Sequence, residues 1–228
     1  MTTTLTRMQS PAPIANAAVN LPSPQLDGRS SVENVLANRR SIRDFRNEPM
    51  SLATLSQLLW AAQGVTRIED APPGWSWGPW AGGKRTAPSA GAMYPIELYA
   101  VAGNIDGLQP GIYKYKPSTH ELLTICAGDK RNQMSTRGPG QKWLEGAPCI
   151  FVVAGIYARL EPRFADRSAR YLHFEVGHVV ENICLQAVAL GLGSTVVGSF
   201  KDDLLKEAVG MPADESPFAV VPVGKPKA

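Results

Sequence analysis

Three arginines and a serine lie within five residues, in the order Arg39-Arg40-Ser41-Ile42-Arg43, where a predicted helix ends. A guanidinium group donates paired hydrogen bonds that match the oxygens of a phosphate group. The cluster therefore predicts a site for a phosphate monoester. A solvated basic patch, balanced by Asp44 and Glu48, is the alternative that the spacing alone leaves open.

Two runs of small residues are the second feature with a chemical use. The first is Pro88-Ser89-Ala90-Gly91-Ala92, just before a predicted strand, and the second is GLGSTVVGS over residues 191–199, just after a long predicted helix. Small side chains let the backbone approach a flat ligand and offer it amide donors, although each run alone is also typical of a simple turn. The second run is not a G-x-G-x-x-G sequence after a strand, and the chain has no P-loop sequence, so we predict neither a Rossmann site nor a P-loop site.

Glu175 and His178 are three residues apart on the long predicted helix, a spacing found in di-iron helical proteins. Such a site needs the pair twice, and it occurs once here. We therefore predict no metal, and a structural His178 held by hydrogen bonds. A Ser-His-Asp hydrolase is not predicted either, because the sequence has no G-x-S-x-G or comparable setting for a nucleophile.

The composition describes one large soluble domain, with 228 residues of which 44% are apolar and 19% charged. The net charge of +3 is too small to indicate a nucleic-acid partner. No run approaches the roughly 18 apolar residues of a membrane span, and the N-terminus lacks the layout of a signal peptide, so we expect no membrane partner and no export. The three cysteines, Cys126, Cys149 and Cys184, are widely spaced, which favours a reducing cytoplasm over a disulfide framework.

The elements that must position these residues follow from caps and hydrophobic periodicity. Residues 1–28, rich in Pro and uncharged residues, predict an arm that is flexible or lies along the surface, before a single domain over residues 29–228. Helices are predicted at 30–40, with a capping box that starts at Ser30, at 51–64, at 202–209, and at 167–190, where a long core helix is expected to be buried on most sides. Strands are predicted at 96–102, 111–116, 122–125, 148–156, 194–197 and 218–223. Between them, Trp75, Trp77 and Trp80 lie in a Gly- and Pro-rich loop that we expect to be a lid or a partner contact. Helices and hairpins mix without strict alternation, so the fold class is α+β.

Taken together, six segments resemble the nitroreductase family of flavoproteins, and most closely its SagB-type branch, which includes azoline dehydrogenases of peptide natural-product pathways. They run in order from Leu21 to Pro226 and include NRRSIRDF, LSQLLWAAQGV, RTAPSAGAMYPIELYAV, PGIYKY, ARYLHFEVGHVVENICLQAVALGLGS and PVGKP. The resemblance implies a nitroreductase-like fold, with a mainly antiparallel central sheet flanked by helices. It also favours the phosphate interpretation of the arginines over the solvated patch.

The resemblance implies an FMN held between the two subunits of a homodimer. Arg39, Arg40, Ser41 and Arg43 correspond to the basic motif that reaches the phosphate, the ribityl chain and the pyrimidine edge, with Arg43 nearest the pyrimidine. Pro88, Ser89, Ala90 and Gly91 match the segment that approaches the flavin from the neighbouring subunit. Gln141 matches a polar contact to the ring, Val197, Gly198 and Ser199 match the stretch that faces the N5 edge, and Lys225 is a further phosphate contact.

The activity that the resemblance implies is that of an FMN-dependent oxidoreductase. NADH or NADPH would deliver hydride to the flavin, and a nitroaromatic, a quinone or a related acceptor would take it up, with flavin N5 and no catalytic side chain doing the chemistry. Two alternatives remain: an azoline dehydrogenase that oxidises a thiazoline or oxazoline in a peptide, and a flavin-binding module without turnover. Arg163 and Phe164 occupy the positions of the Lys-Tyr pair expected of the azoline dehydrogenases, and because Arg cannot serve as a base and Phe has no hydroxyl, the sequence favours reduction.

Overall fold

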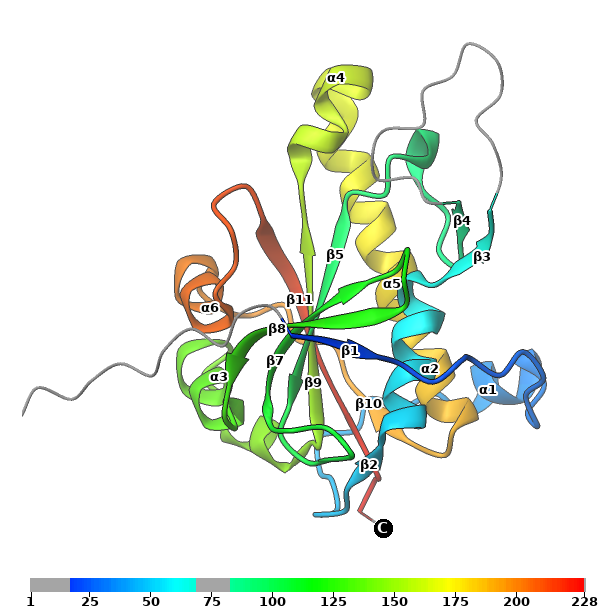
Figure 1. The fold of residues 1–228 in the computed structure, drawn as a ribbon, viewed down its shortest axis with the longest axis vertical. Helices are drawn as coiled ribbons and strands as arrows, with labels where there is room; N and C mark the ends of the chain where they lie inside the picture. The colour runs from blue at the N-terminus through cyan, green and yellow to red at the C-terminus, as the bar shows by residue number, and fades with distance from the viewer. Residues whose placement is uncertain (1–16, 69–82, 228) are drawn as a thin grey trace, which may run out of the picture.

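The computed structural model describes residues 17–68 and 83–227, and the three tryptophans of the predicted loop lie outside that part of the chain. Its centre is a seven-stranded sheet with helices against both faces (Figure 1). The strands lie in the order β1-β8-β7-β5-β9-β11-β10, and every neighbouring pair is antiparallel. In chain order they are β1 (Ala18–Asn20), β5 (Ile96–Ala102), β7 (Gly111–Lys116), β8 (Glu121–Ala127), β9 (Cys149–Gly155), β10 (Gly193–Ser194) and β11 (Ser216–Gly224). The predicted α+β class with a mainly antiparallel sheet is confirmed.

The central strand β9 shows why the sheet needs two helical layers. All seven of its residues are buried. Phe151 and Val153 contribute to one hydrophobic cluster, whereas Ile150 and Val152 contribute to the other. Successive side chains of a strand point to opposite faces, so a strand that is apolar throughout must be covered on both sides.

Two helices cover the first face, α2 (Leu52–Gln63) and α5 (Ser168–Ala189). The start of α2 is fixed by Ser51, whose Oγ accepts from the Thr54 N–H at 3.1 Å, and its end by Gly64, as the sequence predicts. Leu55 and Leu59 of α2 pack with Val179 and Ile183 of α5 in the cluster under the sheet.

The long helix α5 is buried along one side of its length. Leu172, Val179, Ile183 and Ala187 are fully buried, whereas the opposite side, which includes His178, is exposed. The expectation of burial on most sides therefore holds for only one side of the helix in a single chain. Within one chain, His178 faces outward and has no hydrogen-bond partner among the described residues, so the structural role predicted for it finds no support there.

The second face is covered by α3 (Arg131–Arg137), the 3-10 helix η2 (Lys142–Gly146) and α6 (Asp202–Val209). The bounds of α6 agree with the prediction. It ends at Gly210, whose φ of 75° is in the left-handed region that a glycine adopts without strain. Each element contributes one buried side chain to the second hydrophobic cluster: Met134 of α3, Leu144 of η2 and Leu205 of α6.

Where the structure describes the predicted arm, its residues lie along the surface of the domain. Residues 18–20 form β1 and pair with β8, and the Gln25 N–H donates to Oε1 of Gln57 at 2.8 Å. The first helix, α1 (Val32–Asn38), starts one residue later than the predicted capping box, because Ser31 and not Ser30 accepts from the Asn34 N–H, at 3.2 Å. Residues 17–28 therefore lie along α2 and the edge of the sheet.

The remaining elements are short. They are β2 (Met50–Ser51), paired in parallel with β6 (Ile105–Asp106), the hairpin of β3 (Val65–Arg67) and β4 (Lys84–Arg85), η1 (Ala90–Ala92), η3 (Tyr157–Arg159), α4 (Glu161–Phe164) and η4 (Ala165–Arg167). The predicted strand at 194–197 is shorter than expected, since β10 has only two residues and Val197 makes an isolated bridge to Val220.

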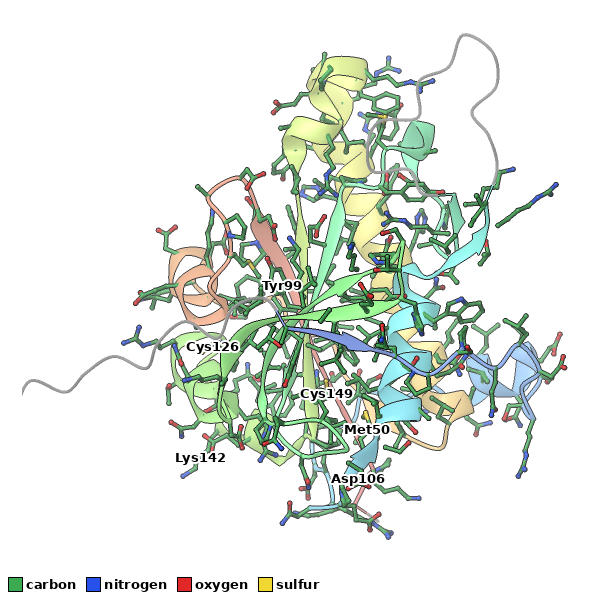
Figure 2. All side chains as sticks on the ribbon, in the orientation of Figure 1. Met50, Tyr99, Asp106, Cys126, Lys142 and Cys149 are labelled. Atoms are coloured by element: carbon green, nitrogen blue, oxygen red, sulfur yellow. The ribbon has the colours of Figure 1, made fainter. Side chains whose placement is uncertain are left out.

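The three thiols are free, and Figure 2 labels two of them, Cys126 and Cys149. Cys149 of β9 and Cys184 of α5 are buried in the first cluster, and Cys126 of β8 is partly buried. Within residues 17–68 and 83–227, none of the helices has the length and the apolar content that crossing a membrane requires.

Candidate functional site

The basic segment 39–46 leaves α1 and runs beside the edge of the sheet. Its Ser41 bridges in parallel to Ser194 of β10, and the Ile42 N–H donates to the Ser194 carbonyl at 2.9 Å. The Arg46 N–H donates to the carbonyl of Lys225 at 2.8 Å. The fold therefore brings the backbone of Lys225, which is far away in the sequence, beside the end of the segment that contains Arg39, Arg40, Ser41 and Arg43.

The carboxylates that the solvated-patch interpretation assigned to these arginines are engaged elsewhere. Asp44 pairs with Lys227 at 2.8 Å, and Glu48 lies 3.6 Å from Arg46. Arg40 folds back, and its guanidinium donates to the carbonyls of Ala37 and Arg39.

The guanidiniums of Arg39 and Arg43, by contrast, form no ion pair with any described residue. Two cations without a carboxylate partner, on the segment that also carries Ser41 and contacts the backbone of Lys225, are groups of the kind that bind a phosphate. The structure thus supports an anion site at this edge of the sheet.

The segment Val197-Gly198-Ser199 continues along the same edge. Val197 exchanges two backbone hydrogen bonds of 2.9 Å with Val220 of β11, the strand that also pairs with β10. Gly198 and Ser199 are exposed, and a Cβ added at Gly198 would meet no atom within 4 Å. The backbone of this segment is open to a ligand that lies along the edge from the arginines.

Residues 88–91 lie toward the other end of α5. The Ala90 N–H donates to Oε1 of Glu175 at 2.8 Å. The Ile42 N–H of the basic segment, by contrast, donates to the carbonyl of Ser194, five residues past Ala189, where α5 ends. Glu175 and Ala189 are 14 residues apart on the helix, which corresponds to about 21 Å. A single chain therefore does not place Pro88, Ser89, Ala90 and Gly91 against its own arginines.

The turn that contains these residues is strained. Gly91, Ala92 and Tyr94 have φ of 59°, 54° and 45°, which is unusual for the two residues other than glycine. Arg163 and Phe164 pack directly against it, because a Cβ added at Gly91 would lie 3.0 Å from Nη1 of Arg163 and 3.1 Å from Cζ of Phe164. Strain of this kind is often retained at functional sites.

Glu175 is the residue of this region that the sequence interpretation missed. The spacing to His178 drew attention to it as a metal ligand, but Glu175 points into the core and His178 away from it. Burial raises the pKa of Glu175 to about 7, while the Ala90 amide, Ser89 and Arg85 act in the opposite direction. In the part of the chain that the structure describes, no group of three or more His, Cys, Asp or Glu side chains is placed to hold a metal ion.

Gln141 is not placed with the arginines by any contact of the described residues. It precedes η2, on the face of the sheet covered by α3 and α6. The far end of η2 does lie beside the basic segment, because a Cβ added at Gly146 would be 4.0 Å from Cβ of Phe45, and Leu144 and Phe45 belong to the same hydrophobic cluster.

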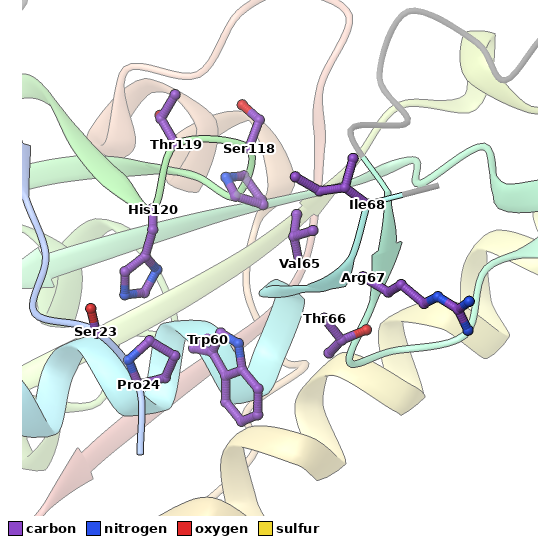
Figure 3. Close-up of a pocket in the computed structure, with 11 residues that line it drawn as sticks. Ser23, Pro24, Trp60, Val65, Thr66, Arg67, Ile68, Ser118, Thr119 and His120 are labelled. Carbon is purple, nitrogen blue, oxygen red and sulfur yellow. The ribbon is translucent and has the colours of Figure 1, made fainter. Parts of the chain in front are cut away.

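A cavity of about 360 Å³ lies apart from all the predicted site residues (Figure 3). Trp60, Val65 and Ile68 form its apolar wall, and the polar side is formed by the turn 117–120 and by Ser23. His120 is already held there, by Ser56 at 2.8 Å and Tyr115 at 2.8 Å. None of the basic or small-residue segments lines this cavity.

Known proteins identify the family. The model of the Nitroreductase family matches residues 36–225. MJ1384 of Methanocaldococcus jannaschii, which is named as a nitroreductase, is 36% identical over 194 residues, which are 85% of this chain and 90% of that protein. The microcin B17-processing protein McbC of Escherichia coli is 24% identical over 133 residues, which are 56% of this chain and 49% of McbC.

Solved structures agree on the fold. One titled as a nitroreductase from Ralstonia eutropha JMP134 has a TM-score of 0.77 at 28% identity, and the match covers 97% of each chain. A chain of the Escherichia coli microcin synthetase McbBCD complex has a TM-score of 0.68 at 22% identity, over 90% of this chain and 75% of the other, and shows a shared fold. Because the family model spans most of the residues and a relative at 36% identity spans nearly the whole chain, this protein belongs to the nitroreductase family.

Proposed function

We propose that this protein is an FMN-dependent oxidoreductase that takes hydride from NADH or NADPH and passes it to a nitroaromatic, a quinone or a related acceptor. The observation that supports it best is the pair Arg39 and Arg43, which have no carboxylate partner among the described residues and lie at the same sheet edge as Lys225. Family membership supplies the redox class.

The types of side chain in the basic segment suit the phosphate and ribityl groups of FMN. Arg39, Arg40, Ser41 and Lys225 would hold the phosphate and ribityl chain, and Arg43 would lie toward the pyrimidine. The exposed residues Gly198 and Ser199, which follow the buried Val197, would lie toward the reactive edge of the ring, and Gln141 is proposed as a polar contact. Bound FMN supplies two-electron transfer between the nicotinamide and the acceptor. A fixed cation beside the pyrimidine stabilises the negative charge of the reduced ring and thus favours reduction.

We also propose a homodimer in which each subunit completes the site of the other. Residues 88–91 contact the first half of α5, whereas the basic segment contacts Ser194, just past its C-terminal end, so a partner subunit would have to supply residues 88–91. The surface offers apolar contacts for a partner, because Val32 and Leu36 of α1 are 67% and 55% exposed, and Phe174 of α5 is 57% exposed. The free thiols agree with an action in the cytoplasm.

The experiment that tests the cofactor is a titration of flavin-free protein with FMN. Arg39→Ala removes one charge-assisted hydrogen bond, which is worth about 1.5–3 kcal/mol, so the Kd for FMN should rise roughly ten- to hundredfold. Arg137→Ala is the matched control, because Arg137 is paired with Glu207 on the exposed surface of α3. An unchanged Kd in Arg39→Ala would refute the assignment of the basic segment.

The same preparation distinguishes an enzyme from a binding module. With FMN bound and oxygen excluded, NADH or NADPH should bleach the flavin absorbance, and a quinone should restore it. A bound flavin that neither nicotinamide bleaches would identify a module that binds without turnover.

The azoline dehydrogenase is the second candidate, and the likeness to McbC favours it. The structure puts Arg163 and Phe164, the residues that stand in place of the expected Lys-Tyr pair, against the turn at Gly91. A guanidinium does not release its proton at neutral pH, and a phenyl ring has none to give, so this pair cannot abstract a proton from an azoline. We therefore rank reduction first.

A further inference from the structure

Glu175 is a buried carboxylate with an unusual set of contacts. It is 2% exposed, on the side of α5 that faces the core. Oε1 accepts the Ala90 N–H at 2.8 Å, while Oε2 is buried and has no hydrogen-bond partner among the described residues. Acidic side chains are seldom fully buried, because the charged form loses its hydration. A carboxylate kept at such a position therefore calls for a reason beyond packing.

Glu175 holds the strained turn over residues 88–94. The C-terminal part of this turn has its own supports, since the Tyr94 N–H donates to Oγ of Ser89 at 2.8 Å and Arg159 donates to the Tyr94 carbonyl at 2.8 Å. Arg159 also pairs with Glu97 of β5, so that end of the turn is tied to the sheet. Glu175 holds the N-terminal part of the turn, through its hydrogen bond with the Ala90 N–H.

The same side of α5 also supports the residues that pack on the turn. Tyr171, one helical turn before Glu175, meets the ring of Phe164 edge to face at 4.8 Å between centroids. Phe164 in turn lies against Gly91. Glu175 and Tyr171 thus fix the turn from below, while Ser89, Ala90 and Gly91 remain partly exposed on its outer surface.

We propose that Glu175 is a positioning residue of the flavin site, which acts by holding the Ala90 N–H and thereby the shape of the turn at residues 88–91. The proposal rests on the proposed function, in which this turn contacts the FMN of the partner subunit. Glu175 itself touches no cofactor in this arrangement. Its effect reaches the flavin through the backbone of Ser89, Ala90 and Gly91.

Three substitutions separate positioning from mere packing. Glu175→Gln keeps an oxygen that accepts the Ala90 N–H, Glu175→Leu removes the acceptor, and Glu175→Asp keeps the charge but withdraws the acceptor by one methylene. Glu207→Gln, on the exposed surface of α6, is the matched control. Each variant is titrated with FMN, the absorption spectrum of the bound flavin is recorded, and thermal unfolding is followed in the flavin-free protein.

We expect Glu175→Gln and Glu207→Gln to bind FMN like the wild type, with the same flavin spectrum. Glu175→Leu and Glu175→Asp should weaken FMN binding by about tenfold or more, because part of the binding free energy is then used to restore the shape of the turn, and should shift the flavin spectrum. If only the charge of Glu175 mattered, Glu175→Gln would lose FMN affinity as Glu175→Leu does. Wild-type affinity in Glu175→Gln therefore identifies the hydrogen bond to Ala90 as the contact that matters. If Glu175→Leu does not fold, the comparison of Asp with Gln decides.

The outcomes distinguish this proposal from the one on which it rests. FMN affinity that falls in Arg39→Ala but is unchanged in Glu175→Asp and Glu175→Leu overturns the role of Glu175 and leaves the flavin site intact. Wild-type protein that does not bind FMN overturns both.

Discussion

The free energy of unfolding should contain a component that falls as the pH rises through the range in which Glu175 ionises. Burial raises the pKa of Glu175 from 4.5, its ordinary value, to about 7 in the folded chain. An acid with a raised pKa keeps its proton in the folded state at pH values where the unfolded state has lost it. This contribution to stability is therefore fully present below about pH 4.5 and is lost as the pH rises to about 7.

The size of the effect follows from the two pKa values. They differ by about 2.5, and one pKa unit corresponds to about 1.4 kcal/mol, so the whole change is about 3 kcal/mol. In a chain of this length, that corresponds to roughly 6–12 °C in Tm. Glu175→Gln abolishes the titration, so its free energy of unfolding relative to the wild type should rise by about 3 kcal/mol between about pH 4.5 and about pH 8. Any constant cost of the added amide group cancels in this difference.

Urea unfolding without added flavin, at one fixed protein concentration and a series of pH values, measures this difference. Other carboxylates with lowered pKa, such as Asp129 beside Arg131, add slopes of the opposite sign, but they are common to both proteins. Glu207→Gln should give a pH profile parallel to that of the wild type. A profile of Glu175→Gln that is also parallel to the wild type would refute the reasoning, because it would mean that Glu175 titrates alike in the folded and unfolded chains.

Two further predictions concern the partner subunit and the direction of the reaction. Replacing Val32 and Leu36 together by Asp should give a monomer in sedimentation velocity and weaken FMN binding with it, and a monomer with wild-type FMN affinity would show that residues 88–91 do not come from a partner. Protein incubated with a thiazoline-bearing peptide should cause no loss of two hydrogens by mass spectrometry while it consumes NADH or NADPH with a quinone, and the opposite pair of results would promote the azoline dehydrogenase.

Elements with strong local signals were predictable in detail. The apolar runs and hairpin turns gave the bounds of β5 and β7, and the cap at Ser51 and the stop at Gly64 gave α2. Elements that depend on a distant partner were not. Residues 18–20 carry no strand signal of their own, and they pair because β8 presents a free edge. The adjacent Ser30 and Ser31 both fit a cap, and only the backbone geometry selects Ser31.

The candidate site divides in the same way. The residue types of the basic segment predict an anion site, but only the fold shows that Asp44 and Glu48 are paired with other cations. The sequence alone does not tell which of Glu175 and His178 is buried. Their burial depends on which side of α5 faces the sheet. The sequence analysis did not name Lys227, which forms an ion pair with Asp44 of the basic segment. Its place two residues after Lys225 was the signal that could have found it.

The length of α5 is the physical reason for the proposed two-subunit site. The helix has 22 residues, or about 33 Å. It holds the turn at Ala90 through Glu175 in its first half, whereas the basic segment contacts Ser194, five residues past its C-terminal end. A rigid helix cannot shorten to bring the two ends of the site together within one chain. A second subunit in antiparallel orientation, however, would set its own turn beside the arginines of the first, and the two-fold symmetry would build the other site by the same contact. The exposed side of α5 and the apolar face of α1 are the surfaces that such a pairing would cover, so the residue that shapes the turn and the residues that bind the anion would belong to one site only in the dimer.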